Sequence, residues 1–158
     1  MMFFLYNNNQ SIVQYILKSY LVCVSVSVII SFGLFCFELI PEESPSDNLG
    51  IIDVIGGSLI SPAIETIGIY LIIKPLGLFL NSYKVKSIIV ASIFSYLHFL
   101  VSPIWGVTTF FSFFVFAVSF SVWTMRSDRL GMLVPFMIHF LLNFSSLIFV
   151  YISQFYYQ

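Results

Sequence analysis

Long apolar runs, separated by short polar connections, dominate the chain. A helix that crosses a bilayer needs about 20 predominantly apolar residues. Five stretches fit this description, with soft edges: 13–39, 51–73, 85–101, 104–125 and 131–152. The connections are acidic ("PEESPSDN", 41–48), basic or proline-containing. The pattern predicts an all-α fold, a polytopic membrane helical bundle of about five transmembrane helices.

Composition agrees with a membrane protein. Hydrophobic residues make up 59% of the chain and charged residues 8%, with a mean hydropathy of +1.03, whereas soluble domains carry roughly a quarter charged residues. The net charge of −1 and the lack of a Lys/Arg-rich run argue against a nucleic-acid partner. Cys23 and Cys36 have no neighbouring His or Cys at metal-ligand spacing, so both are predicted to be buried thiols.

The basic residues predict an orientation, because Lys and Arg collect on the cytoplasmic side of membrane proteins. Five of the six basic residues fall in two connections on the same side of a five-helix chain: Lys74, Lys84, Lys86, Arg126 and Arg129. The connection with Glu42, Glu43 and Asp47 falls on the other side. The N-terminus, with a retained first helix, is therefore predicted to be cytoplasmic. Lys18 lies inside the first segment and would have to snorkel.

Four polar residues lie inside the apolar segments. A charged group at the bilayer centre costs about 2.5–3.5 kcal/mol on insertion scales, so such residues are candidates for function. They are Glu65, His98, His139 and Asn143. From the cytoplasmic side, Glu65 and His139 are predicted to lie roughly 10 Å deep, and the other two roughly 20 Å. Glu38 and Asp53 lie near predicted outer boundaries and are interpreted as interfacial.

Each polar residue also has an ordinary structural interpretation. A single His or Asn in a membrane helix often forms a hydrogen bond between helices. A single Glu can snorkel or stay protonated. The combination of all four at similar depth is the stronger indication of a site.

Three short motifs resemble those of the CPBP family of intramembrane glutamic endopeptidases, which includes CAAX prenyl proteases and bacteriocin-related bacterial proteins. Phe94 to His98 resembles the FxxxH motif, and His139 to Asn143 resembles HxxxN. Glu65 matches the first Glu of EExxxR, but Thr66 replaces the second Glu and Tyr70 replaces the Arg. The resemblance implies a CPBP-like four-helix core over 51–158, preceded by a transmembrane helix and acidic loop over 1–50.

The resemblance implies hydrolysis of a peptide bond by an activated water, with neither metal nor cofactor. Glu65 would be the general base and would pair with His98, while His139 and Asn143 would support the oxyanion. Phe94, Thr66 and Tyr70 would be supporting residues. The partners would be the lipid bilayer and a peptide or membrane-protein substrate, and the short chain suggests a prokaryotic plasma membrane.

Three other interpretations compete with the peptidase. The lost Glu and Arg of the first motif favour a non-catalytic homologue that acts as an immunity or partner-binding protein. A zinc site would use two His and one Glu, but the sequence has no HExxH motif. A proton or ion pathway would use the same ionisable residues, although five short helices leave little room for a gated pore.

Overall fold

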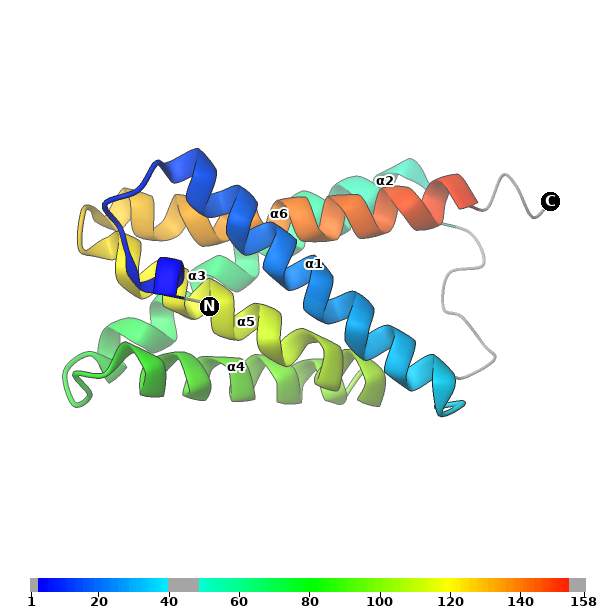
Figure 1. Ribbon diagram of the computed structural model, residues 1–158, viewed down its shortest axis with the longest axis horizontal. Coiled ribbons are helices and arrows are strands. Elements are labelled where there is room, and N and C mark those ends of the chain that lie inside the picture. Colours follow the sequence, from blue (N-terminus) through cyan, green and yellow to red (C-terminus); the bar gives the residue numbers. More distant parts are fainter. Residues whose placement is uncertain (1–2, 40–48, 154–158) are drawn as a thin grey trace.

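The computed structural model describes residues 3–39 and 49–153, and helices are the only regular elements in these ranges (Figure 1). Their bounds are η1 (Phe3–Tyr6), α1 (Ile12–Cys36), α2 (Ile51–Ile55), η2 (Gly56–Ile60), α3 (Ser61–Leu76), α4 (Tyr83–Phe99), α5 (Pro103–Thr124) and α6 (Asp128–Ser153). The segment η1 is a 3₁₀-helix and η2 is a π-helix. The predicted all-α membrane bundle is confirmed. The acidic connection 41–48 lies outside the described residues.

Among the described residues, four helical stretches are long and apolar enough to cross a membrane: Ile12–Cys36, Ile51–Leu76, Pro103–Thr124 and Asp128–Ser153. The second of them is the continuous rod α2–η2–α3. The remaining predicted span, 85–101, corresponds to α4, whose 17 residues give a length of about 26 Å. It is short because both of its ends are fixed. Ser82 caps its start by accepting the Val85 N–H, and Pro103 already begins the next helix.

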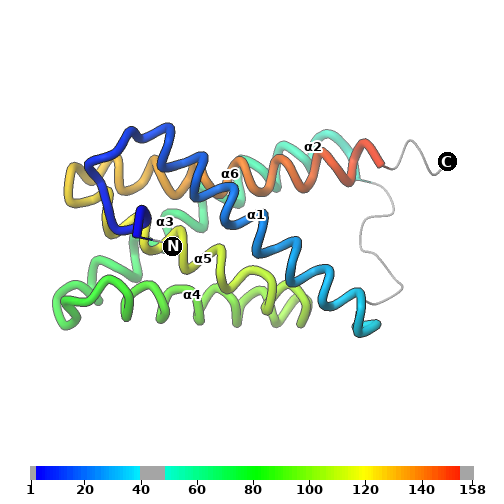
Figure 2. Tube along the Cα trace, viewed as in Figure 1, coloured from blue at the N-terminus to red at the C-terminus, as the bar shows by residue number. Residues whose placement is uncertain are grey.

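Helix α5 lies at the centre of the bundle and is the most buried helix. It packs against α4 and α6, while α1 crosses over α5 and α6 (Figures 1 and 2). Aromatic side chains of α5 fill the core, including Phe113, Phe116, Phe120 and Trp123, each at most 1% exposed. This helix is apolar on all sides, as expected for a helix surrounded by other helices.

The outer surface of the bundle is apolar at span depth, as expected where lipid replaces water. Helix α1 shows this most clearly, with Leu21, Ile29 and Phe32 all more than half exposed. Its last turn also exposes Cys36, whereas Cys23 is fully buried. The prediction of two buried thiols is thus right for Cys23 and wrong for Cys36, because the end of α1 has no helix packed over that side.

Four helix ends lie at the same end of the bundle and bring the basic residues together. The C-terminal ends of α3 and α5 and the N-terminal ends of α4 and α6 lie at the left of Figure 1. Lys74 pairs there with Asp128 across 2.8 Å, and the Lys84 ammonium lies 5.3 Å from the centre of the Tyr6 ring. We call this the basic end of the bundle: Lys74, Lys84, Lys86, Arg126 and Arg129. The chain therefore has one strongly cationic end.

Candidate active site

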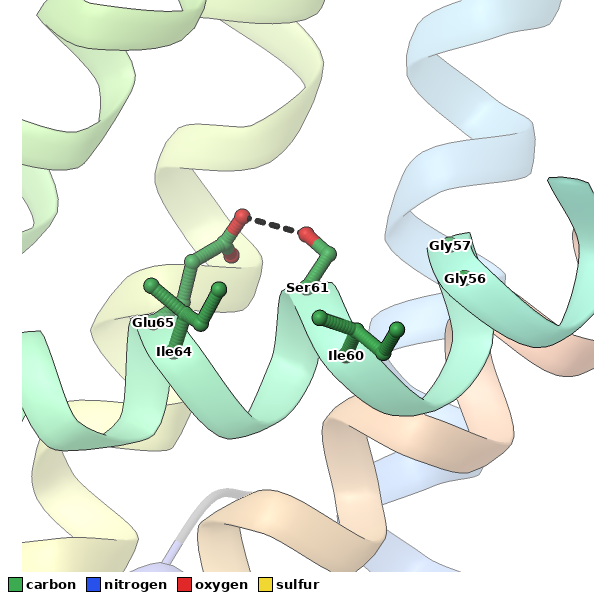
Figure 3. Close-up of a pocket in the computed structure, with 6 residues that line it drawn as sticks. All are labelled: Gly56, Gly57, Ile60, Ser61, Ile64 and Glu65. Carbon is green, nitrogen blue, oxygen red and sulfur yellow. Dashed lines mark hydrogen bonds between the residues drawn. The ribbon is translucent and has the colours of Figure 1, made fainter.

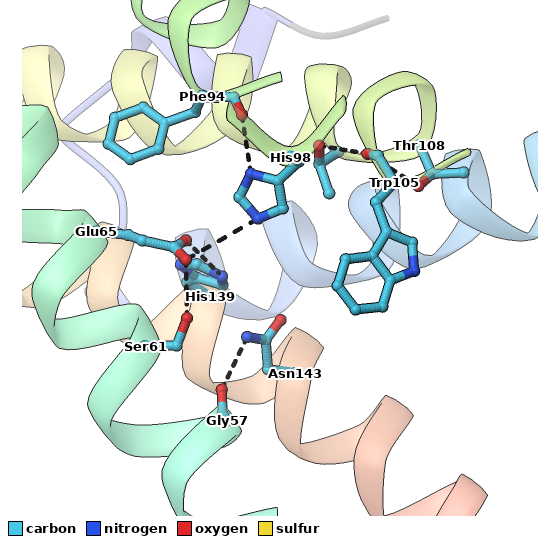
Figure 4. A network of polar contacts seen from close by, with 10 residues as sticks. Gly57, Ser61, Glu65, Phe94, His98, Trp105, Thr108, His139 and Asn143 are labelled. Carbon is cyan, nitrogen blue, oxygen red and sulfur yellow. Dashed lines mark hydrogen bonds and ion pairs between the residues drawn. The ribbon is translucent and has the colours of Figure 1, made fainter. Parts of the chain in front are cut away.

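The site begins with the π-turn η2, whose geometry follows from Pro62. A proline ring clashes with the carbonyl four residues earlier and has no N–H to donate. In η2 the Ser61 N–H donates to the carbonyl of Gly56, five residues back, which is the π pattern. The carbonyl of Gly57 would need the N–H of Pro62, which does not exist. Asn143 Nδ2 fills this role by donating to Gly57 O at 3.0 Å (Figure 4).

One helical turn later, α3 presents Glu65. Ser61 stands four residues earlier, so both side chains share one face of the helix. The Ser61 hydroxyl donates a hydrogen bond to Glu65 Oε1 at 2.8 Å (Figure 3). The Glu65 side chain is 17% exposed. The carboxylate is therefore largely enclosed but still reachable from one side.

Helix α4 brings His98 to the same carboxylate. Its Nδ1 lies 2.8 Å from the carbonyl oxygen of Phe94, and because a carbonyl only accepts, Nδ1 must carry the proton. This bond fixes the ring so that Nε2 points at Glu65 Oε1, 4.0 Å away. That separation is too long for a direct hydrogen bond. A water molecule between His98 Nε2 and Glu65 Oε1 would contact the imidazole and the carboxylate at the same time.

Helix α6 brings His139 to the other carboxylate oxygen. His139 Nε2 lies 3.5 Å from Glu65 Oε2, and the residue is 5% exposed. Its ring stacks on Phe116, with 4.5 Å between ring centres. The buried Nδ1 has no hydrogen-bond partner. This favours the neutral ring with its proton on Nε2, because an unpaired buried N–H at Nδ1 would be the costlier alternative.

An aromatic wall from α5 supports both imidazoles. Phe113 stacks on the ring of Phe94 at 4.5 Å, and its centre lies 5.2 Å from the ring of His98. Gly68 of α3 allows Phe94 to come close, because a Cβ there would lie 2.8 Å from Phe94 Cζ. The two histidines are thus held by packing as well as by their polar contacts.

A groove of about 440 Å³ leads to the carboxylate. It is lined by Gly56, Gly57, Ile60, Ser61, Ile64 and Glu65 (Figure 3). Ile60 and Ile64 are 59% and 63% exposed, so at this depth they face lipid. Gly56 and Gly57 carry no side chains that would narrow the groove. An apolar chain in the groove would meet its first ionisable group at Glu65.

The structure brings together three of the four predicted polar residues, Glu65, His98 and His139 (Figure 4). The prediction that Glu65 and His139 share a depth is confirmed. The prediction that His98 lies about 10 Å deeper is wrong. Its Nε2 lies 4.0 Å from Glu65 Oε1, because counting from segment edges ignores helix tilt and side-chain reach. Asn143 is one turn beyond His139 and is bonded to Gly57.

The remaining predicted residues support the helices around the site. The Phe94 carbonyl holds His98, as described above. Thr66 is 2% exposed, and its hydroxyl has no hydrogen-bond partner. Tyr70 packs edge-on against Phe120, and the Lys74 ammonium lies 5.6 Å from the centre of its ring. Glu38 and Asp53 both lie at helix ends, where Asp53 accepts the Gly50 N–H at 2.9 Å.

Sequence reasoning missed two contributors, the Ser61 hydroxyl and the Gly57 carbonyl. The i, i+4 spacing of Ser61 and Glu65 was a usable signal for the first. For the second, Pro62 indicated that a backbone carbonyl near Gly57 would lack its usual N–H donor. The sequence did not indicate which side chain would donate instead. Within residues 3–39 and 49–153, no group of three His, Cys, Asp or Glu is arranged to hold a metal ion.

The chain was compared with protein-family models, curated proteins and solved structures. No family model, no curated protein and no solved structure matches the chain.

Proposed function

We propose that this protein is an intramembrane endopeptidase that hydrolyses a peptide bond without a metal ion, as the resemblance to the CPBP family implies. The observation that carries the proposal is one carboxylate with an imidazole on each oxygen, at 4.0 and 3.5 Å. This group stands at the end of an apolar groove within a membrane span. Ionisable residues at such positions are retained for function.

In the proposed reaction, Glu65 acts as general base. A water between Glu65 Oε1 and His98 Nε2 gives its proton to the carboxylate, and the water oxygen bonds to the scissile carbonyl carbon. The C–N bond then breaks, and Glu65 returns the proton to the leaving amine. General acid–base assistance of this kind contributes about 10²–10⁴-fold in rate. The low dielectric around the site strengthens each of these interactions.

The other polar residues would orient this machinery. Ser61 holds Oε1 of Glu65 by a hydrogen bond, and His139 Nε2 lies 3.5 Å from Oε2, so both residues orient the carboxylate. In this proposal His98 Nε2 accepts the second hydrogen of the attacking water, because the one N–H of its neutral ring is bonded to the Phe94 carbonyl. Asn143 has a different part from the one its motif implies: it fixes the π-turn that carries Ser61, because its amide N–H is already bonded to Gly57 O.

Cleavage by the reconstituted protein tests the proposal. The protein would be placed in liposomes with a library of single-span peptides, and new peptide termini would be counted by mass spectrometry. Glu65→Gln keeps the shape of the side chain but removes the base, so we expect a loss of at least about 100-fold, and a comparable loss for His98→Ala. Glu38→Gln is the matched control, an acidic residue at the end of α1. Cleavage by Glu65→Gln at the unmodified rate would refute the proposal.

A non-catalytic immunity or partner-binding role is the second candidate. It is favoured by Thr66 and Tyr70, which replace the Glu and Arg of the family motif, and by the packing of Tyr70 against Phe120. Under this alternative, binding of a partner or an immunity phenotype would survive in Glu65→Gln and in His139→Ala. Under the peptidase proposal, both substitutions would abolish the biological effect together with cleavage.

A further inference from the structure

A second hollow, of about 140 Å³, lies at the basic end of the bundle. It is formed where α3 ends, α4 begins and α5 ends. Lys74 and Lys86 supply its charged wall, and Ile73 and Phe120 supply its apolar floor. Both Lys74 and Thr124 stand within three residues of the end of a membrane span. The hollow is therefore at the depth where lipid headgroups meet hydrocarbon.

The charges around this hollow are not balanced by the chain. Lys74 pairs with Asp128, but the ammonium of Lys86 has no ion pair or hydrogen bond to any described residue, although the side chain is half-buried. Lys84 and Lys86 also stand at the start of α4, whose first turn has no acidic residue. Positive charge at a helix N-terminus opposes the helix dipole. Positive potential is thus concentrated here, and among the described residues only Asp128 pairs with one of these lysines.

The neighbouring turn adds an apolar feature on the same side. Leu78 and Phe79, between α3 and α4, are 81% and 84% exposed. Exposed apolar side chains beside lysines are typical of segments that insert into the membrane interface. A ligand that combines an anionic group with an apolar body would satisfy the lysines, the floor of the hollow and this turn together.

We propose that this hollow binds the phosphate of an anionic phospholipid headgroup from the leaflet at the basic end. Lys86 contacts the phosphate, Lys74 contributes a second positive charge, and the upper acyl carbons lie along the exposed side chains of Leu78 and Phe79. Basic hollows between membrane helices bind anionic headgroups in this manner. The proposal does not depend on peptide hydrolysis and holds equally for a non-catalytic protein.

Lys84 and Lys86 form a matched pair for the test. They lie two residues apart on α4 and carry the same charge, but only Lys86 lines the hollow. The full-length protein would be titrated with phosphatidylglycerol and, separately, with phosphatidylcholine of the same acyl chains, and bound lipid would be counted by native mass spectrometry. We expect preferential binding of phosphatidylglycerol, weakened about fivefold by Lys86→Gln and unchanged by Lys84→Gln.

Three results would overturn the proposal. Equal binding of the two lipids would show no headgroup preference, and equal losses in Lys84→Gln and Lys86→Gln would indicate a diffuse cationic surface. If inorganic phosphate displaced phosphatidylglycerol as effectively as a second anionic lipid does, the ligand would be free phosphate. The thermal unfolding midpoint of each variant without added lipid shows whether the fold is intact, and Lys74→Gln gives a second lining substitution should Lys86→Gln fail to fold.

Discussion

At the scale of single residues, the carboxylate of Glu65 is defined by what each oxygen faces. Oε1 accepts a hydrogen bond from Ser61 and faces His98, while Oε2 faces His139. These three partners come from α3, α4 and α6, so the geometry of the site depends on three helix positions. Ser61 is the closest of the partners and lies on the same helix as Glu65, and its contact is therefore the one least affected by helix movement.

Replacement of Ser61 by Ala should slow peptide cleavage about tenfold, because a hydrogen bond to a charged group is worth about 1.5–3 kcal/mol. Ser61→Thr keeps the hydroxyl and should retain most of the rate. The rate of product formation in liposomes measures both variants, and circular dichroism verifies that the helices remain. Equal rates for Ser61→Ala and the unmodified protein would show that Ser61 does not orient the base.

The residues of the site could be predicted from the sequence where an ionisable side chain interrupts an apolar run. Glu65, His98 and His139 are ionisable groups in apolar runs, and that contrast alone marks them. Ser61 carries no such contrast, because serines are common in these helices and usually bond to their own backbone, as Ser121 and Ser146 do here. The partner of Asn143 could not be predicted either, since it is a backbone carbonyl on another helix.

At the scale of helices, Asn143 links α6 to the π-turn. We expect Asn143→Asp to destabilise the protein by about 1–3 kcal/mol, because it leaves the partly buried carbonyl of Gly57 without a donor. Ser146→Ala is the control, one turn later on α6, where the hydroxyl bonds only to the carbonyl of Leu142. Unfolding in a denaturing detergent, followed by circular dichroism, measures the difference. If the two variants were equally stable, the bond between Asn143 and Gly57 would not stabilise the fold.

Close helix contacts depend on particular glycines. A Cβ at Gly131 would lie 3.1 Å from Thr124 Cα, where α5 turns into α6, whereas a Cβ at Gly33 would meet nothing within 4 Å. Gly131→Ala should therefore destabilise the protein by about 1–3 kcal/mol. Gly33→Ala should stabilise it by about 0.5–1 kcal/mol, since Gly in a helix interior is unfavourable. Thermal unfolding of both variants tests the contrast, and a stabilising Gly131→Ala would contradict it.

Most helices could be predicted from the sequence, and where the observed bounds differ from the predicted ones the cause is local. The predicted stretch 104–125 became α5 (Pro103–Thr124), because Pro103 starts the helix and the polar run after Thr124 ends it. The stretch 51–73 became three elements. Apolar periodicity did not reveal the π-turn within it, since the residues of Gly56–Ile60 are all apolar or small. Hydrophobicity does not report which carbonyl an N–H reaches.

At the scale of the whole molecule, five of the six basic residues are gathered at one end. We predict that the basic end is cytoplasmic, since Lys and Arg collect there. The two natural cysteines test this directly: Cys36 is exposed at the far end of α1, and Cys23 is buried. A membrane-impermeant maleimide should label Cys36 in intact cells, and an added Arg129→Cys only after permeabilisation. The reverse labelling pattern would establish the opposite orientation.

The fold class was the most predictable property, because a bilayer permits few solutions. Backbone groups in hydrocarbon must be satisfied within the chain, so long apolar runs of this kind become helices. The order in which helices pack was not predictable in the same way. Nothing in the composition of α5 distinguishes a central helix from a lipid-facing one, because α1 is also apolar on all sides and yet exposes Leu21, Ile29 and Phe32.

The π-turn η2 has a further consequence for the rod α2–η2–α3. A π-turn holds one residue more than the α-helical ladder needs, and one residue corresponds to a rotation of about 100° around the axis. Gain or loss of a single residue in Gly56–Ile60 would therefore turn α2, and the part of the groove formed by η2, relative to Glu65, while α3 kept its contacts with His98 and His139. The part of the groove lined from α3 would stay with the base, so the η2 part of the groove can change while the site stays as it is.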